Sequence, residues 1–224
     1  MVSHMRDINI AWARELARKT LQDALPRRWE HSLGVGRRAE QLAPILGRDA
    51  ELLAMSAYLH DIGYAPDLVD VGFHPIDGAR YLRDVHGADE LLCTLVAHHT
   101  CAEIEAGDRG LLDILQGEFP KRRTDLVQAL TYCDMTTSPD GIPVRAVDRL
   151  AEIRQRYGPD DLVTATIEKA TPCMLSAVRA IEQRMALADV RPGGTAEVVA
   201  DAQPHRAIHR VSLGFVAAYP AHLA

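Results

Sequence analysis

Apolar residues recur along most of the chain at the three-to-four-residue spacing of an amphipathic helix. Residues 8–25 show this spacing in a single stripe made of Ile10, Ala13, Leu16, Ala17, Leu21 and Leu25. The same spacing, bounded by Asp, Pro or Gly, predicts helices over residues 27–46, 49–60, 75–85, 88–100, 110–119, 123–135, 143–158 and 160–187. We expect Pro172 to kink or split the last of these. Because no alternating run with a hairpin turn is present, we predict an all-α fold.

The length and composition fit one main domain. A chain of 224 residues, of which 47% are hydrophobic, can bury one substantial core. We expect residues 1–25 to form a helix that packs on this domain, residues 26–140 to form its centre, and residues 141–190 to add C-terminal helices. The amphipathic pattern fades after the sequence PGG at 192–194, so we expect a loosely ordered tail over residues 191–224.

The charge distribution narrows the range of partners. The formal net charge is −6 and the Lys and Arg residues are dispersed, so we expect a small-molecule partner and no nucleic acid. No apolar stretch reaches the length of a membrane span, and the N-terminus lacks the apolar region of a signal peptide. These features predict a cytoplasmic protein without a membrane partner. A homodimer is one arrangement that the sequence leaves open.

The cysteines are few and show no CxxC spacing. Their number is below that of a secreted disulfide scaffold, and most of them lie within helical apolar patterns. We therefore expect reduced core residues at Cys93, Cys101, Cys133 and Cys173.

Histidine and aspartate residues lie near the ends or middles of several predicted helices. The sequence AYLHDIGY, residues 57–64, places two of them where an apolar helix reaches a glycine. In a helical bundle, side chains on facing helices can converge on one metal site. Imidazole and carboxylate ligands without cysteine indicate a redox-capable or hydrolytic divalent metal and argue against structural zinc. The candidates are His31, His60, Asp61, His74, His98, His99 and Asp134.

Each candidate also has a purely structural interpretation. His31 can be a half-exposed helix residue, and His60 with Asp61 can end a helix and start a turn. Their joint occurrence in order favours a metal site over several independent accidents. Gly34 and Gly36, in the middle of a predicted helix, indicate close packing or a ligand nearby, because glycine there costs about 1 kcal/mol.

The ordered set resembles a known superfamily. The succession of His31, His60-Asp61 and Asp134 is similar to the defining pattern of the HD-domain metal-dependent phosphohydrolases, and LHDIG matches its commonest wording. The resemblance spans residues 27–140 and implies an HD-domain helical bundle with additional C-terminal helices. It also implies that these four residues hold a first metal ion.

Two further segments resemble the two-metal branch of this superfamily. FHPIDGARYL is similar to the HPxxGAxxL segment and would add His74 as a ligand. VAHHT is similar to the segment that supplies one more histidine. His98 and His99 both stay open for that position, and the HT ending favours His99. The implied cofactors are two divalent ions, with Mn, Fe, Co, Ni and Mg all open.

The resemblance implies hydrolysis of a phosphate ester by hydroxide that the two ions activate. Asp61 would bridge and orient, with His60 beside it, and an outer carboxylate or the unused histidine of the 98/99 pair would relay the proton. The remaining phosphate charge calls for cations. Among the arginines near the histidines we choose Arg28 and Arg80 for this catalytic role.

We expect the substrate to be a small-molecule phosphate ester and, more narrowly, a nucleotide. The segment HHTCAEIEAGDRG lacks the GYP that follows the double histidine in cyclic-di-GMP phosphodiesterases of the superfamily, which argues against that activity. The loop TTSPDGIPV, after Asp134, is expected to line the entrance. One alternative is an HD-type di-iron oxygenase resembling myo-inositol oxygenase, in which the same ligand set is used. Another is a non-catalytic nucleotide-sensing HD module, although such modules usually lose ligands that this chain keeps.

Overall fold

The fold is a helical bundle arranged around one apolar helix, α4 (Ala50–Leu59). The computed structural model describes residues 8–158 and 162–189. Over these residues it contains no β-strand, and an isolated bridge pairs Thr137 with Pro143. The all-α prediction is confirmed.

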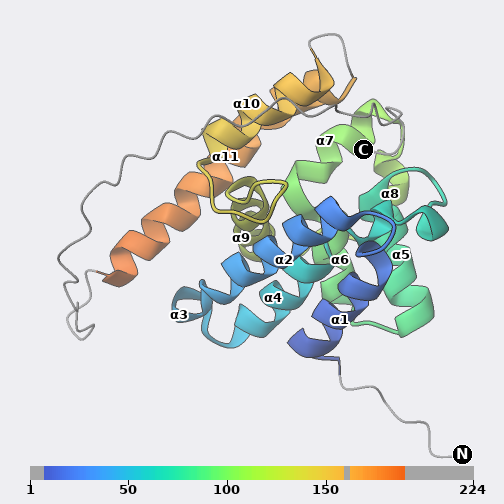
Figure 1. Ribbon diagram of the computed structural model, residues 1–224, viewed down its shortest axis with the longest axis horizontal. Helices are drawn as coiled ribbons and strands as arrows, with labels where there is room; N and C mark the ends of the chain where they lie inside the picture. The colour runs from blue at the N-terminus through green and yellow to red at the C-terminus, as the bar shows by residue number, and fades with distance from the viewer. Residues whose placement is uncertain (1–7, 159–161, 190–224) are drawn as a thin grey trace, which may run out of the picture.

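The other helices follow one another closely along the chain (Figure 1). The α-helices are α1 (Ile10–Leu21), α2 (Pro26–Glu40), α3 (Ala43–Leu46), α5 (His74–His86), α6 (Glu90–His98), α7 (Ala102–Asp108), α8 (Leu112–Glu118), α9 (Thr124–Met135), α10 (Ala146–Tyr157) and α11 (Leu162–Asp189). The short 3₁₀ turns are η1 (Gly47–Asp49), η2 (Ile62–Tyr64), η3 (Pro66–Leu68) and η4 (His99–Cys101).

Helix α4 lies at the centre because it is apolar on most of its surface. It packs against α1, α2, α6 and α9, and its Leu53, Ala54, Ala57 and Leu59 are fully buried. A helix that is apolar all round is stable only inside a fold. Its C-terminal end therefore carries the residues that follow, His60 and Asp61, into the interior. Helices α10 and α11 lie together along one side of the bundle in Figure 1, with α1 on the opposite side.

Three boundaries differ from the prediction. The helix predicted over residues 27–46 is divided into α2 and α3, because Pro44 cannot donate to the helix before it and sits in the first turn of α3. Helix α7 was not predicted, because it follows Cys101 and lacks a polar N-cap residue. Helix α11 runs through Pro172 without dividing.

Two glycines allow backbones to touch. A Cβ on Gly63 would lie 2.1 Å from the carbonyl oxygen of His74 and 2.5 Å from the nitrogen of Gly78. This contact presses η2 against the start of α5 and so places Asp61 beside His74. A Cβ on Gly34 would lie 2.5 Å from the backbone of Gly141. Close packing therefore explains the mid-helix glycine of α2.

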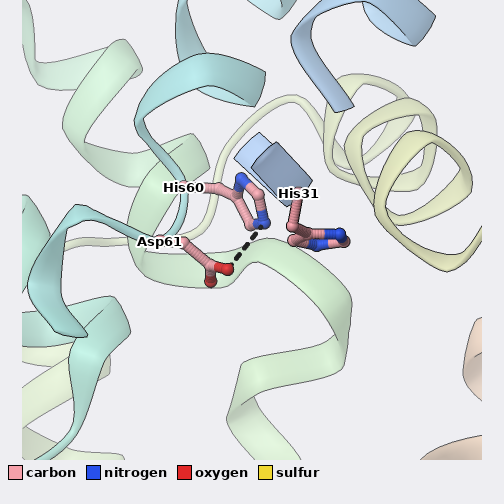
Figure 2. A group of neighbouring side chains, drawn as sticks. All are labelled: His31, His60 and Asp61. Atoms are coloured by element: carbon pink, nitrogen blue, oxygen red, sulfur yellow. Dashed lines mark ion pairs between the residues drawn. The ribbon is translucent and has the colours of Figure 1, made fainter. Parts of the chain in front are cut away.

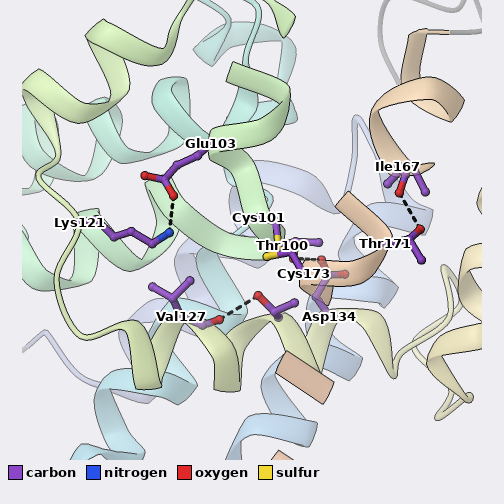
Figure 3. Close-up of a disulfide and its surroundings, with 10 residues drawn as sticks. Thr100, Cys101, Glu103, Lys121, Val127, Asp134, Ile167, Thr171 and Cys173 are labelled. Carbon is purple, nitrogen blue, oxygen red and sulfur yellow. Dashed lines mark hydrogen bonds and ion pairs between the residues drawn. A yellow bond between two sulfur atoms is a disulfide. The ribbon is translucent and has the colours of Figure 1, made fainter. Parts of the chain in front are cut away.

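A disulfide joins Cys101 in η4 to Cys173 in α11 (Figure 3). The expectation that all cysteines are reduced was wrong for this pair. The two residues are separated by 72 positions in the sequence, so their spacing gives no hint of pairing, but the fold brings their Cα atoms to 6.6 Å. Cys93 and Cys133 are free and buried, as expected.

The domain division made from the sequence stays a prediction, and the tail at 191–224 lies outside the described residues. Across residues 8–158 and 162–189, no helix is both long enough and apolar enough to span a bilayer. The cytoplasmic location also stays a prediction.

Candidate metal centre

Six of the candidate ligands meet in the interior, although they come from five separate parts of the chain. His60 and Asp61 follow α4, and Figure 2 shows them facing His31 of α2. The exposed fraction is 3% for His31, 1% for His60 and 3% for Asp61. The other three are Asp134 in α9, His74 at the start of α5 and His99 in η4.

Asp61 lies between two groups of histidines. Its Oδ2 atom is 3.4 Å from Nε2 of His60, and its Oδ1 atom is 3.5 Å from Nε2 of His74 and 4.0 Å from Nε2 of His99. One group that can hold a metal ion is therefore His31, His60 and Asp61, and the second is Asp61, His74 and His99. A carboxylate placed in this way can give one oxygen to each of two ions.

The orientation of the imidazole rings fits metal binding. In three of them Nδ1 donates a hydrogen bond to a backbone carbonyl, at 2.9 Å for His31 to Ser138, 2.8 Å for His60 to Ala57 and 2.6 Å for His99 to Val96. In His60 and His99 this fixes the tautomer and leaves the Nε2 lone pair toward the centre of the cluster, whereas Nε2 of His31 is the atom that faces Asp134. Nε2 of His60 is buried and has no hydrogen-bond partner in the described part of the chain, which is the condition expected of a metal ligand.

The two carboxylates are held ionised. Burial alone would raise the pKa of Asp61, but His60 and Arg28 outweigh it and keep that pKa well below its usual value. Burial likewise opposes ionisation of Asp134, and the hydrogen bond with His31 outweighs it, so the pKa of Asp134 is also lowered. Nε2 of His31 lies 3.0 Å from Oδ1 of Asp134. Two negative charges are therefore available to balance a divalent ion.

The second group contains neutral histidines. Nε2 of His74 lies 3.1 Å from Nε2 of His99. Burial lowers the pKa of both, with the neighbouring His99 adding to the effect at His74 and His60 adding to it at His99. Both rings are thus uncharged at neutral pH, and the neutral imidazole is the form that binds a metal.

Arg28 lies directly beside the cluster. Its Nη1 donates to Oδ2 of Asp61 at 2.8 Å, and its guanidinium lies 3.6 Å from the centre of the Tyr64 ring. The Tyr64 ring in turn stacks on His74 with 3.8 Å between centroids. The stacked Tyr64 orients both the arginine and the histidine, because a flat ring restricts each to one plane.

Two candidates lie elsewhere. His98 is adjacent to His99 in sequence, but the backbone turns sharply after them through Thr100 and Cys101, both with positive φ. Nε2 of His98 donates to the carbonyl of Phe119 at 2.6 Å, away from the cluster. The relay role considered for the unused histidine therefore has no geometric support.

Arg80 likewise does not reach the cluster. Its guanidinium donates to Glu118 and Asp70, and those two carboxylates hold it on the outer side of α5. These contacts form an ion-pair network apart from the metal cluster, so they give no support to the predicted catalytic role of Arg80.

The cluster opens into a pocket of about 790 Å³, counted with its open mouth. One part of its lining surrounds the cluster and comprises Arg28, His31, Asp61, Tyr64, His74, His99, Thr100 and Asp134. The facing part comes largely from α10 and α11 and comprises Arg149, Ile153, Arg156, Val163, Thr166, Ile167, Ala170 and Met174. The loop after Asp134 does not line the pocket as expected. Its Ser138 carbonyl instead orients His31.

Comparison with known proteins places this site in a family. The family model described as "HD domain" matches residues 28–138, which contain all six converging residues. The chain belongs to the metal-dependent HD superfamily. The HD domain implies a divalent metal ion, and the His and Asp groups described above are where this chain can bind it.

Curated relatives of the HD domain are proteins named Ribonuclease Y. That of Thermoanaerobacter pseudethanolicus is 30% identical over 103 residues, covering 45% of this chain and 20% of the relative. That of Clostridium novyi is 27% identical over 131 residues, covering 57% and 23%. That of Clostridium perfringens is 26% identical over 166 residues, covering 70% and 32%. The chain thus spans between a fifth and a third of these relatives' length. No solved structure matches.

These relatives overturn one expectation. The prediction that nucleic acid is not a partner was wrong, because the related HD domains belong to proteins named as ribonucleases. The dispersed charge excluded a broad basic face, which is the source of salt-dependent affinity for long nucleic acids. A metal centre can receive a single phosphodiester without such a face.

Several residues of the HD site were not predicted from the sequence. Two of them are Thr100 and Tyr64. The hydroxyl of Thr100 donates to Oδ2 of Asp134, and the Tyr64 ring contacts Arg28. Each lies close to a motif residue in the sequence, and this closeness was the one signal that could have indicated a role in the site. Arg149 and the other residues of α10 and α11 gave no signal. They look like ordinary surface or core positions until the fold brings those helices over the pocket.

Proposed function

We propose that this chain hydrolyses a phosphate ester of a nucleotide unit, with two divalent metal ions in the site. The observation that carries the proposal is the position of Asp61, whose two oxygens face two different groups of histidines in one pocket. Bound there, divalent ions would supply hydroxide from water at neutral pH and offset the negative charge of the phosphoryl group.

The side chains of the site have distinct roles in this proposal. Asp61 holds both groups in register, and the Nδ1 hydrogen bonds of His31 and His60 keep their Nε2 atoms directed inward. Arg28 is the cation beside Asp61, and its planar guanidinium can also donate to a phosphoryl oxygen. Tyr64 restricts Arg28 to that side of the pocket. His98 and Arg80 have no role at the cluster in this proposal.

The nucleotide unit is supported by the pocket and by the relatives. The pocket gathers Arg28, Tyr64 and the candidate metal ligands around one concave space, which is the arrangement of sites that bind small ligands. The relatives are named Ribonuclease Y, so RNA is a substrate to test beside free nucleotides. The relatives are named as ribonucleases, and this name favours hydrolysis over the HD-type oxygenase alternative.

The test combines metal analysis with a substrate screen. Protein purified without added metal is analysed for bound ions, then assayed with Mn²⁺, Co²⁺, Ni²⁺, Mg²⁺ or Fe²⁺ on nucleoside monophosphates and on an end-labelled RNA oligonucleotide. We expect about two transition-metal ions per chain and turnover that a chelator abolishes. Bound iron with oxygen uptake and no phosphate-ester cleavage would favour an oxygenase, and absence of bound metal under every condition would favour a sensing module.

A further inference from the structure

The wall of the pocket that faces the metal centre comes from outside the part of the chain that matches the family. The HD match ends at residue 138, whereas α10 and α11 begin at Ala146 and Leu162. Most of the residues that these helices contribute to the pocket are apolar, including Ile153 and Met174. The same two helices also contribute two arginines to the pocket, Arg149 and Arg156. These arginines are a second feature of the pocket that attracts anions, in addition to the metal centre.

Arg149 is unusual for an arginine because it is almost completely buried. Only 8% of its surface is exposed, and its Nε atom is buried without a hydrogen-bond partner among the described residues. Arginine is rarely buried unless its charge and N–H groups are satisfied. Because the Arg149 side chain also lines the pocket, an oxygen-rich anion that enters the pocket could accept hydrogen bonds from the part of the guanidinium that faces it.

Arg149 shares its ion-pair partner with another arginine. Its Nη1 donates to Glu152, and the same carboxylate accepts hydrogen bonds from Arg156 at 2.9 Å and 2.5 Å. Glu152 is therefore not the partner of Arg149 alone, and the guanidinium of Arg149 carries its positive charge inside the wall. Since the neighbouring side chains Ile153 and Met174 are apolar, water screens this charge less than it would at an open surface.

We propose that Arg149 binds a second phosphate of the substrate, separate from the phosphate that is cleaved at the metal centre. The substrate class is then a nucleotide unit that carries two phosphates. A free nucleoside bisphosphate and the end of an RNA strand share this chemistry. The inference rests on the proposed function. It implies that α10 and α11 determine which substrates bind.

The first test measures binding to metal-free protein, so it does not depend on turnover. Adenosine 3′,5′-bisphosphate and adenosine 5′-monophosphate are titrated calorimetrically into the wild type and into Arg149→Met, which keeps the length of the side chain. We expect the wild type to bind the bisphosphate about tenfold or more tightly than the monophosphate. In Arg149→Met this ratio should fall close to one. Arg145→Met, an exposed arginine of the same region that pairs with Asp148, should keep the wild-type ratio.

The second test separates the two sources of the second phosphate. The metal-loaded protein is given adenosine 3′,5′-bisphosphate and the 5′-phosphorylated dinucleotide pApA, and kcat/KM is compared with that for the monophosphate and for unphosphorylated ApA. Whichever pair shows the larger preference identifies the source, and Arg149→Met should reduce that preference. Circular dichroism confirms that the variant is folded, and Arg149→Gln, which removes the charge but keeps a polar side chain, serves as the replacement if it is not.

The outcomes distinguish this inference from the proposed function. Equal binding of bisphosphate and monophosphate by the wild type, or an unchanged ratio in a folded Arg149→Met variant, overturns the second-phosphate site. A preserved binding preference without turnover on any ester supports the site while overturning the hydrolase proposal.

Discussion

At the residue scale, the decisive feature is that one carboxylate serves two groups of ligands. Asp61 is the residue that belongs to both groups, so its removal affects both, whereas loss of a histidine affects one. It is also the partner of Arg28. Replacing it therefore removes a ligand from both groups and also removes the ion pair with the half-buried Arg28.

The first prediction concerns this carboxylate. Asp61→Ala should lose most of the bound metal and lower kcat/KM by more than about 100-fold, since even outer contacts of a metal site contribute 10- to 100-fold. The measurement is metal content by mass spectrometry together with the ester assay. Asp67→Ala, an exposed aspartate six residues later, is the matched control and should behave as the wild type. Full metal content in Asp61→Ala would contradict the site.

The second prediction concerns pH. Burial lowers the pKa of His74, His98 and His99 below 6.5 in the folded protein. As the pH falls below 6.5 the unfolded chain takes up protons that the folded chain does not, so stability decreases. The slope is about 1.4 kcal/mol per pH unit for each histidine. The carboxylates, with lowered pKa values, lose their contribution only below about pH 4.

Urea unfolding of metal-free protein at pH 7.5, 6.5 and 5.5 measures this slope. His98→Gln should reduce the slope of stability against pH by the contribution of one histidine, about 1.4 kcal/mol per pH unit. This change removes no member of either ligand group. A free energy of unfolding that stays flat across this range would show that the three rings titrate normally.

At the scale of elements, the contact of η2 with α5 sets the distance between the two ligand groups. The helical period was enough to predict the helices and the order of the ligands along them. It could not show which of His98 and His99 faces the other ligands, because that depends on where α6 ends and how the backbone leaves it at His99. Nor could it distinguish Arg28 from Arg80, since each is one arginine on an amphipathic helix.

The third prediction tests the contact at Gly63. Gly63→Ala places a methyl group 2.1 Å from a backbone oxygen that cannot move alone, so the protein should lose about 2 to 3 kcal/mol of stability and bind less metal. Denaturant unfolding and metal analysis measure the two effects. Gly117→Ala in α8, where a Cβ meets nothing within 4 Å, should instead be neutral or stabilise by up to about 1 kcal/mol. Equal stability of the two variants would exclude a tight contact at η2.

At the scale of the whole molecule, α11 closes over the pocket and is fastened by the Cys101–Cys173 disulfide (Figure 3). The sequence predicted helices in this region, but it gave no reason to place them against the metal centre. Such long-range packing depends on the combined shape of α9, α10 and α11. The pocket wall and its Arg149 were therefore visible only in the folded chain.

The fourth prediction concerns this crosslink. The double variant Cys101→Ala with Cys173→Ala should lose about 4 kcal/mol of stability, because the disulfide restricts a loop of 72 residues in the unfolded chain. Denaturant unfolding with and without reductant measures this loss. Reductant should destabilise the wild type and leave the double variant unchanged. Wild-type protein that is indifferent to reductant would mean that the two thiols are not joined.

The order of these parts along the chain allows the pocket wall to be exchanged separately from the metal centre. The residues around the metal centre are all encoded before residue 138, and α10 and α11 are encoded after it. A chimaera joined near Arg145 would replace the pocket wall formed by α10 and α11 with that of another protein. It would keep every residue of the metal centre. The graft has one added requirement, which is a cysteine in the incoming helix at the position of Cys173, so that the new wall is fastened to the old centre.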